Sequence, residues 1–361
     1  MKKQYEAGTI CFSVVDDSRK ELLGDATGNR KIAIRLYYPV DPKETAGKSR
    51  APYAGERKMA AIRQTFHLPK ASMKNETDCY EAVPISTAEK FPLLLFNHGY
   101  NSYVEANTRL CTDLAANGFI VASIGHANES VENDYEDGSY DLFDKKINKM
   151  MYKQGVFKAL RVQMKLMKKK ASLEEIDLAF REYCQTHTSY ITERIEEWVK
   201  DTLFVLEVMK ERYSDYIDFS RGVAAGGHSA GGATAYKLCL ECDEITCGLN
   251  IDGALFGDHK NRILRKPFYQ FSCKENWNLE SGVLLRKEAP VYTAIFSNMK
   301  HLGFIDIKFE AAMKSLTGTL PGEVMHSHLL EGCLFLLNRY LKGEEIPLNE
   351  SHHADVIIEE H

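Results

Sequence analysis

The sequence lacks the features of several specialised classes of protein. It contains no apolar run of membrane-spanning length, no internal repeat and no low-complexity tract. Its formal net charge of -5 argues against a surface built for nucleic acid. Residues 1–6 carry positive charge with no apolar stretch behind them, so they do not form a signal peptide as they stand. A secreted chain trimmed of its leader would begin in the same way.

Cysteine usage argues against a disulfide framework and against a metal site. The nine cysteines are scattered and odd in number, so at least one cannot belong to an internal disulfide, and reduced thiols in a cytoplasm are the simpler interpretation. Cys239 and Cys242 form one CxxC with Cys247 close by, but no second CxxC or histidine pair completes a zinc set. We therefore expect a cytoplasmic protein with no metal and no cofactor.

The 361 residues, 44% of them hydrophobic, suit one large α/β domain. Apolar runs at 91–96 and 119–124 are typical of buried parallel strands, and the amphipathic segment between them, 108–117, ends at Gly118. This alternation predicts a parallel sheet with right-handed crossovers. Further strands are expected at 10–15, 32–38, 222–225, 246–251, 267–272 and 290–296, and further helices at 56–66, 186–212, 233–240 and 329–342.

The predicted architecture is a mostly parallel central sheet flanked by helices, in one domain over residues 1–342. A helical lid insertion at about 127–190 interrupts the alternation, and a polar, loose tail is expected at 343–361. Within the insertion, 145–170 holds ten Lys or Arg and no acid, with apolar residues at helical spacing. This segment is either a lid helix with its lysines in water or a surface that rests on an anionic membrane.

The motif that organises the chain is a GxSxG, formed by Gly227, Ser229 and Gly231 between a predicted strand and a predicted helix. This context is typical of a nucleophile elbow. We expect Ser229 to take a strained backbone conformation that lifts its Oγ clear of the sheet edge. The two glycines are expected to lie against neighbouring backbone, where a Cβ would clash.

A serine hydroxyl needs a base within hydrogen-bond reach and an acid to hold that base. In this kind of fold the acid and then the histidine follow the serine, each on a loop after a strand. Asp252 and His301 meet that description. Other residues that follow strands or precede the last helix remain alternatives; they are Glu275 and Asp258 for the acid, and His326 and His328 for the base.

An oxyanion hole needs two backbone N–H groups aimed at the developing negative charge. The N–H of Ala230, directly after the nucleophile, is one candidate. The second is expected from the loop after the 91–96 strand, where His98, Gly99 and Tyr100 stand, and we assign it to the Tyr100 N–H.

At these motifs the sequence resembles the platelet-activating factor acetylhydrolase family of α/β-hydrolases, both the plasma lipoprotein-associated phospholipase and the intracellular type II enzyme. The similar stretches are 35–39, 96–100, 113–122, 227–234, 250–254 and 301–309. The resemblance favours Asp252 over Glu275 and His301 over His326. The sequence departs from the family at Ala230, where a bulky aromatic residue is usual, and at Tyr100, where a smaller aliphatic one is usual. At His126-Ala127-Asn128 it loses the family's basic–acidic pair.

The resemblance implies metal-independent hydrolysis of an ester with a short acyl chain, either a small soluble ester or a phospholipid. Ser229 is expected to attack the carbonyl and His301 to take its proton, while Asp252 steadies the imidazolium. Because the same triad cleaves amides, a serine peptidase or amidase is an alternative. A non-catalytic protein that binds lipid surfaces is another.

Overall fold

The computed structural model describes residues 5–24, 28–70, 72–154, 171–257, 259, 262–310 and 313–361. The strands are β1 (Glu6–Lys20), β2 (Asn29–Val40), β3 (Cys79–Glu81), β4 (Leu93–Asn97), β5 (Ile120–Ile124), β6 (Glu132–Asp134), β7 (Tyr140–Leu142), β8 (Val223–His228), β9 (Ile245–Ile251), β10 (Phe268–Cys273), β11 (Val291–Phe296) and β12 (Val356–Glu360). The α-helices are α1 (Glu56–Thr65), α2 (Thr108–Ala116), α3 (Lys145–Gln154), α5 (Leu173–His187), α6 (Ser189–Tyr213), α7 (Ala230–Glu241), α8 (Trp277–Glu280), α9 (Lys314–Thr317) and α10 (Gly322–Leu337). Short 3₁₀ turns are η1 (Pro42–Thr45), η2 (Ser281–Leu284), η3 (His301–Phe304) and η4 (Asp306–Phe309), and η6 (Asn338–Lys342) is a π-helical turn.

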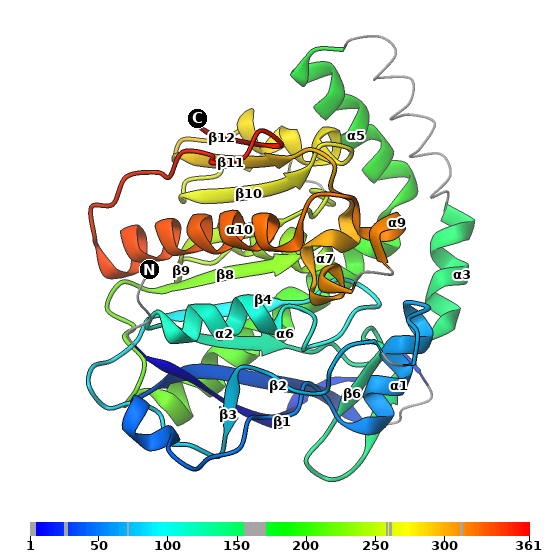
Figure 1. Ribbon diagram of the computed structural model, residues 1–361. Coiled ribbons are helices and arrows are strands. Elements are labelled where there is room, and N and C mark those ends of the chain that lie inside the picture. Colours follow the sequence, from blue (N-terminus) through cyan, green and yellow to red (C-terminus); the bar gives the residue numbers. More distant parts are fainter. Residues whose placement is uncertain are drawn as a thin grey trace.

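Ten strands form one sheet in the order β12-β11-β10-β9-β8-β4-β5-β2-β1-β3 (Figure 1). The six strands from β11 to β5 are parallel to one another, whereas β2 and β12 run antiparallel to their neighbours at either side. The strands expected at 10–15 and 32–38 are present as β1 and β2, which pair antiparallel. The predicted α/β-hydrolase architecture, a mostly parallel central sheet flanked by helices, is therefore confirmed.

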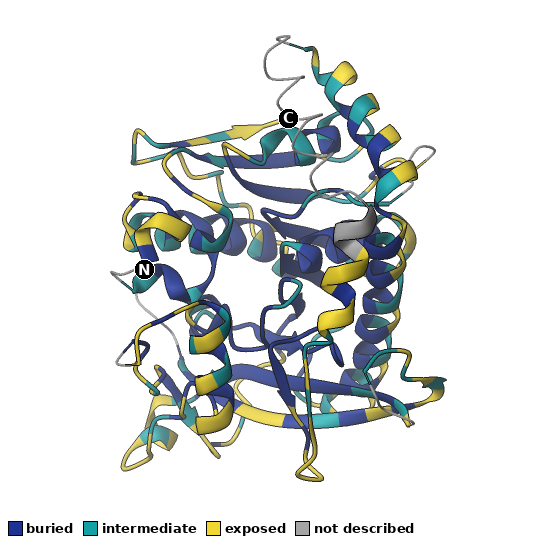
Figure 2. Ribbon diagram, turned by 90° about the vertical axis from the view of Figure 1, so that its right-hand side faces the viewer, coloured by how far each residue is buried: buried dark blue, intermediate teal, exposed yellow. Residues whose placement is uncertain are grey.

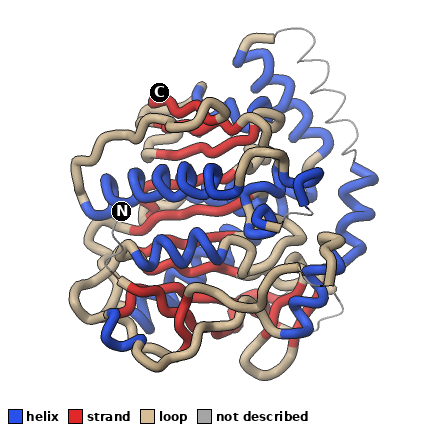
Figure 3. The backbone as a smooth tube through the Cα atoms, in the orientation of Figure 1, coloured by secondary structure: helices blue, strands red, loops and turns tan. Residues whose placement is uncertain are grey.

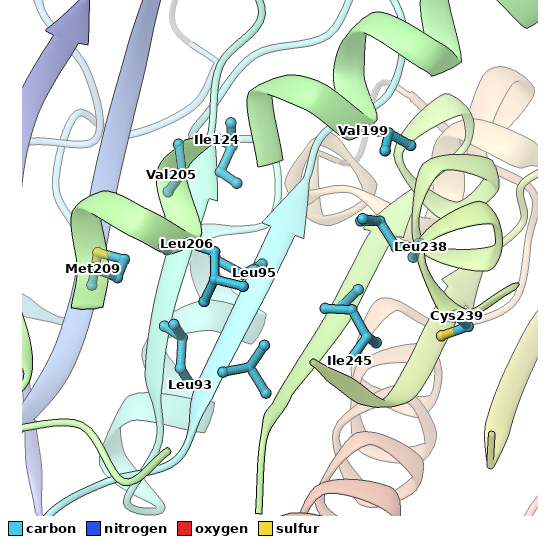
Figure 4. Close-up of a cluster of buried hydrophobic side chains, with 14 of the residues drawn as sticks. Leu93, Leu95, Ile124, Val199, Val205, Leu206, Met209, Leu238, Cys239 and Ile245 are labelled. Carbon is cyan, nitrogen blue, oxygen red and sulfur yellow. The ribbon is translucent and has the colours of Figure 1, made fainter. Parts of the chain in front are cut away.

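Helices cover both faces of the sheet (Figures 1 and 3). In β4 successive side chains alternate between these faces. Leu93 and Leu95 belong to the core cluster that includes residues of α6 and α7, and Figure 4 shows them beside Leu206 of α6. Leu94 and Phe96 belong to the core beneath α2 and α10. All four are at most 1% exposed, so β4 is the continuous apolar run that a central parallel strand requires.

The insertion lies at the carboxyl ends of the parallel strands, where α3 and α5 stand beside the sheet (Figure 1). Figure 2 views this edge and shows buried strands behind helices with exposed outer faces. The insertion also contains an antiparallel hairpin, β6–β7, which the sequence pattern did not indicate. The start of α5 is a capping box, in which Ser172 and Glu175 satisfy each other's backbone N–H groups. The domain and insertion boundaries themselves stay a prediction.

Three expectations for the helices and the tail are wrong. The single helix expected at 186–212 is broken at Thr188, whose Oγ1 and N–H both donate to the carbonyl of Cys184; its backbone there is not helical, with φ -125° and ψ 18°. The last helix starts at Gly322, seven residues before the expected start at 329. The tail is not loose, because β12 pairs with β11 and supplies partners for backbone groups that would otherwise form an open edge.

Candidate active site

Ser229 occupies the turn between β8 and α7, with φ 57° and ψ -121°. A non-glycine residue at positive φ is strained, as the elbow motif predicts. A Cβ added at Gly227 or Gly231 would collide with the backbone carbonyl of Asn97 at the end of β4. These two expectations for the turn are confirmed, because only glycine lets the strand, the turn and the helix come so close.

Three side chains that are far apart in the sequence meet above this turn. His301 Nε2 lies 2.9 Å from Ser229 Oγ, and His301 Nδ1 lies 2.7 Å from Asp252 Oδ2. Asp252 follows β9 and His301 opens η3 after β11, so both come from loops at the carboxyl ends of parallel strands. Ser229 is part-buried and the His301 side chain is 38% exposed, so the serine–histidine pair faces the solvent side of the sheet edge.

Asp252 is 1% exposed and accepts several hydrogen bonds. The Cys273 N–H donates to Oδ1 at 2.6 Å, and Asn276 Nδ2 donates to Oδ2 at 2.8 Å, the oxygen that also faces His301. Burial by itself raises the pKa of a carboxyl group, but the hydrogen bond and charge of His301 and the Cys273 amide outweigh it here. The pKa of Asp252 is therefore lowered, and the group is held as a carboxylate.

His228 forms a neutral support behind the site. Its Nε2 lies 3.1 Å from the backbone carbonyl of His301, and because a carbonyl only accepts, Nε2 carries the hydrogen. The two imidazole rings are 4.7 Å apart between centroids. Burial, followed by the charge of His301, lowers the pKa of His228 to about 3. This histidine therefore holds the backbone of His301 without competing for its proton.

The loop after β4 lies directly against the serine, since a Cβ added at Gly99 would be 3.2 Å from Ser229 Cβ. His98 Nδ1 donates to the Gly99 carbonyl at 2.6 Å, and Ser130 Oγ lies 2.8 Å from His98 Nε2. In a trans peptide the C=O and the following N–H point in opposite directions. The Tyr100 N–H is therefore aimed away from the His98 ring.

The second expected donor, the Ala230 N–H, belongs to the first residue of α7 and has no acceptor within its own helix. Ala230 follows Ser229 directly at the start of α7, and Gly99, the residue before Tyr100, lies against Ser229 on the loop after β4. The assignment of the two amides to an oxyanion hole stays a prediction. The sequence pattern did not point to His98 as the residue that sets the direction of the second amide; the signal available was its place directly before Gly99.

The alternatives from the sequence lie elsewhere or outside the described residues. His326 Nε2 pairs with Asp113 at 2.7 Å, and His328 Nδ1 donates to the Val324 carbonyl at 2.8 Å, both within or beside α10. The carboxylate at His301 Nδ1 is Asp252, the position for which Glu275 was the rival. Asp258 is outside the described residues.

A buried charged network lies against the loop after β4, the loop that carries the expected oxyanion donor Tyr100. The carboxylate of Asp201, on α6, accepts from Arg30 Nη2 at 2.6 Å and from His126 Nδ1 at 2.8 Å. The ring of Trp198, one turn earlier on the same helix, stacks on His126 at 3.7 Å and on Tyr100 at 6.4 Å between centroids. Through these contacts α6 holds the loop that carries the expected oxyanion donor.

All nine cysteines are free thiols. Among the described residues no group of three or more His, Cys, Asp or Glu is arranged to hold a metal ion. None of the helices in that part of the chain combines the length and the apolar character that crossing a bilayer requires.

Comparison with known proteins places this geometry in a family context. A family model described as platelet-activating factor acetylhydrolase, isoform II, matches residues 4–300. The platelet-activating factor acetylhydrolase of Cavia porcellus is 26% identical over 343 residues, which cover 87% of this chain and 73% of the relative. That of Bos taurus is 25% identical over 270 residues, which cover 71% of this chain and 59% of the relative. Among solved structures, a ferulic acid esterase from Streptomyces cinnamoneus superimposes with a TM-score of 0.75 at 18% identity, covering 98% of this chain and 96% of that one. At this low identity, the similarity to the ferulic acid esterase is evidence for a shared fold alone.

Proposed function

The chain belongs to the family described as platelet-activating factor acetylhydrolase, isoform II, and from this membership and the geometry of the site we propose that it hydrolyses short-chain carboxylic esters through Ser229, His301 and Asp252. The protein is a serine ester hydrolase. The observation that carries the proposal is the pair of contacts made by His301, 2.9 Å to Ser229 Oγ and 2.7 Å to Asp252 Oδ2. Since the family match ends at residue 300, the role of His301 depends on this geometry.

In the first half-reaction Ser229 Oγ attacks the ester carbonyl carbon while His301 Nε2 takes the hydroxyl proton. The negative charge that develops on the carbonyl oxygen is held by the N–H groups of Tyr100 and Ala230. The tetrahedral intermediate collapses when His301 returns the proton to the leaving alkoxide, which departs as the alcohol.

The second half-reaction repeats these steps with water in place of serine. His301 takes a proton from the water, the hydroxide oxygen attacks the acyl carbon, and the carboxylic acid leaves as Ser229 regains its proton. Asp252 stabilises the imidazolium in both halves and does not itself transfer the proton.

We propose that the acyl group lies on the α7 side of the site, next to a small apolar cluster. Ile191, Ile195 and Ala233 form a small buried cluster against which Tyr100 and Phe256 pack, and Ala233 lies one helical turn after Ser229. The preference for a short acyl chain comes from the family resemblance, and the substrate is either a small ester or a phospholipid with a short acyl group.

Turnover of p-nitrophenyl acetate, butyrate and octanoate, beside an aminoacyl-nitroanilide, tests the proposal. We expect the acetate and butyrate to be hydrolysed fastest and the anilide to be left intact. Ser229→Ala should remove the ester activity, and a fluorophosphonate should label the wild-type chain on the peptide that contains Ser229. Anilide turnover would favour the amidase alternative, and equal ester rates in Ser229→Ala would overturn the mechanism.

Peripheral membrane contact through 145–170 and a cytoplasmic location stay predictions. Of that segment only α3 is described, with Met150 46% exposed, and 155–170 lies outside the described residues. Co-sedimentation with anionic liposomes at low salt is expected if the basic segment rests on lipid, and its absence would leave the lid interpretation.

A further inference from the structure

Glu280 is a fully buried carboxyl group for which the mechanism above has no use. It is the last residue of α8 and is 0% exposed. Its Oε2 accepts from Gln270 Nε2 at 2.8 Å and from the hydroxyl of Ser272, both on β10. Because β10 is the neighbour of β9, this pocket lies beside the loop that carries Asp252.

The second oxygen, Glu280 Oε1, has no hydrogen-bond donor facing it among the residues that the structure describes. Asp252 is within side-chain hydrogen-bond reach of Glu280 and is the charged group that acts on it most strongly. Two carboxylates in contact and away from water cannot both be ionised. Asp252 has donors on both of its oxygens, whereas Glu280 has an oxygen without one, so the proton belongs on Glu280.

We propose that Glu280 is a neutral carboxylic acid that donates a hydrogen bond to the Asp252 carboxylate and so sets how much negative charge Asp252 presents to His301. Glu280 is thus a positioning residue for the triad, and the inference rests on the proposed function. Each hydrogen bond that Asp252 accepts spreads its charge and reduces its pull on the imidazolium. Removal of this donor should make His301 easier to protonate.

The other groups around the pair agree with this assignment. The Cys273 thiol has its pKa raised by burial and by the Asp252 charge, so it stays neutral, with Sγ 3.4 Å from Asp252 Oδ2. On the opposite side Asp252 faces His301 and His228, as described above. From α5, Asp177 faces Gly282, two residues after Glu280, but its carboxylate is paired with the guanidinium groups of Arg181 and Arg286.

Burial and the neighbouring Asp252 charge raise the pKa of Glu280 well above its usual range, whereas Gln270 and Ser272 oppose the shift. The direction agrees with the geometric argument. No cation in the described part of the chain forms an ion pair with Glu280, so only the hydrogen bonds from Gln270 and Ser272 act against the cost of a second buried negative charge.

The test is the pH dependence of kcat/KM for p-nitrophenyl acetate in Glu280→Gln and Glu280→Leu. The Gln amide offers an N–H to Asp252 and an oxygen to Gln270 and Ser272, so it imitates the neutral acid. We expect the acidic limb of the kcat/KM profile, which reports protonation of His301, to stay within about 0.3 pH unit of wild type in Glu280→Gln. In Glu280→Leu the same limb should move to higher pH by about one unit. Glu288→Gln, an exposed glutamate paired with Arg265, is the matched control and should leave the profile unchanged.

An ionised Glu280 would give the opposite result, because Glu280→Gln would remove a negative charge beside the triad and move the acidic limb to lower pH. Such a shift, or an unmoved limb in Glu280→Leu, overturns the proposal. If Glu280→Leu does not fold, the infrared difference spectrum of wild type against Glu280→Gln decides. The band of a protonated carboxyl must be present in wild type and absent in the variant. This measurement needs no turnover, so an inactive wild type would defeat the proposed function and leave the protonation of Glu280 still tested.

Discussion

The imidazole Nδ1 of His98 and the carbonyl oxygen of Gly99 are 2.6 Å apart, so the side chain of His98 contacts the Gly99–Tyr100 peptide, one peptide beyond its own. Burial, followed by the charge of His126, lowers the pKa of His98 to about 3, and the ring is neutral at any working pH. With Nδ1 as donor, Nε2 is left to accept from Ser130 Oγ. The direction of the Tyr100 N–H therefore depends on a neutral His98 together with the Ser102 N–H, which donates to the same Gly99 carbonyl at 3.0 Å.

Replacement of His98 by alanine should loosen the Gly99–Tyr100 peptide, whose carbonyl keeps only the Ser102 N–H as a donor. We expect kcat for p-nitrophenyl acetate to fall by about 10²-fold with KM nearly unchanged, since an oxyanion donor acts mainly in the transition state. In Ser130→Ala the hydrogen bond from His98 Nδ1 to the Gly99 carbonyl is kept, so kcat should fall much less than in the His98 variant. A rise in KM with kcat intact would show that His98 shapes substrate binding and not the oxyanion hole.

Asp252→Asn should lower kcat by about 10³–10⁴-fold while the fold is kept, because the amide no longer holds His301 in the required tautomer or stabilises its charge. Glu275→Gln, at the rival position, is the control and is expected to stay near wild type. Steady-state kinetics and circular dichroism of both variants check this. Comparable losses in the two variants would mean that the assignment of the acid is wrong.

The buried carboxylate of Asp201 should be among the most sensitive positions for stability. Asp201→Ala removes the 2.6 Å partner of Arg30 and leaves Arg30 with Glu21 at 2.8 Å and Glu129 at 3.5 Å. We expect a cost of about 3 kcal/mol of unfolding free energy, the lower end for a broken buried ion pair. Glu197→Ala, at a partly exposed member of the same network, should cost about 1 kcal/mol or less. Urea unfolding compares the two, and equal losses would contradict a special role for burial.

The same carboxylate has a predictable effect with pH. Burial opposes ionisation of Asp201, but the charge of Arg30 and the hydrogen bonds from His126 and Arg30 outweigh it and lower its pKa. A lowered pKa in the folded state contributes stability that is present above the ordinary value and is lost as the pH falls. Acid unfolding should therefore begin at a higher pH in Asp201→Asn than in wild type.

Asp306 should show the opposite dependence. Burial raises its pKa from 3.8 to about 7, although the Arg109 N–H and the Tyr53 hydroxyl donate to its Oδ2. The folded chain therefore holds this proton more tightly than the unfolded chain does, and stability falls as the pH rises from about 4 to about 7. Asp306→Asn keeps an acceptor for both donors and should reduce the loss. The fall in stability is measured as the difference between the urea midpoints at pH 5 and pH 8. An identical difference in wild type and variant would exclude Asp306 as the cause of the pH dependence.

The sequence pattern predicted correctly those features that depend only on residues close together in the chain. Gly227, Ser229 and Gly231 lie within one turn, and the steric demands of that turn are the same in any chain that makes it. The strands that precede Asp252 and His301 could also be recognised in the sequence, because buried parallel strands are continuous apolar runs. The break at Thr188 and the strand at 356–360 were missed, since the first depends on a side chain bonding back to Cys184 and the second on an open edge at β11.

The sequence by itself determined the fold class, the elbow and the order in which serine, acid and base follow one another along the chain. Only the tertiary structure decided which residues surround them. Strand pairing and helix packing between distant segments bring Glu280 beside Asp252 and Asp201 beside His126, behind the loop after β4. Whether a buried carboxyl group is ionised depends on the donors and charges that this packing brings to it, and no spacing along the chain records them.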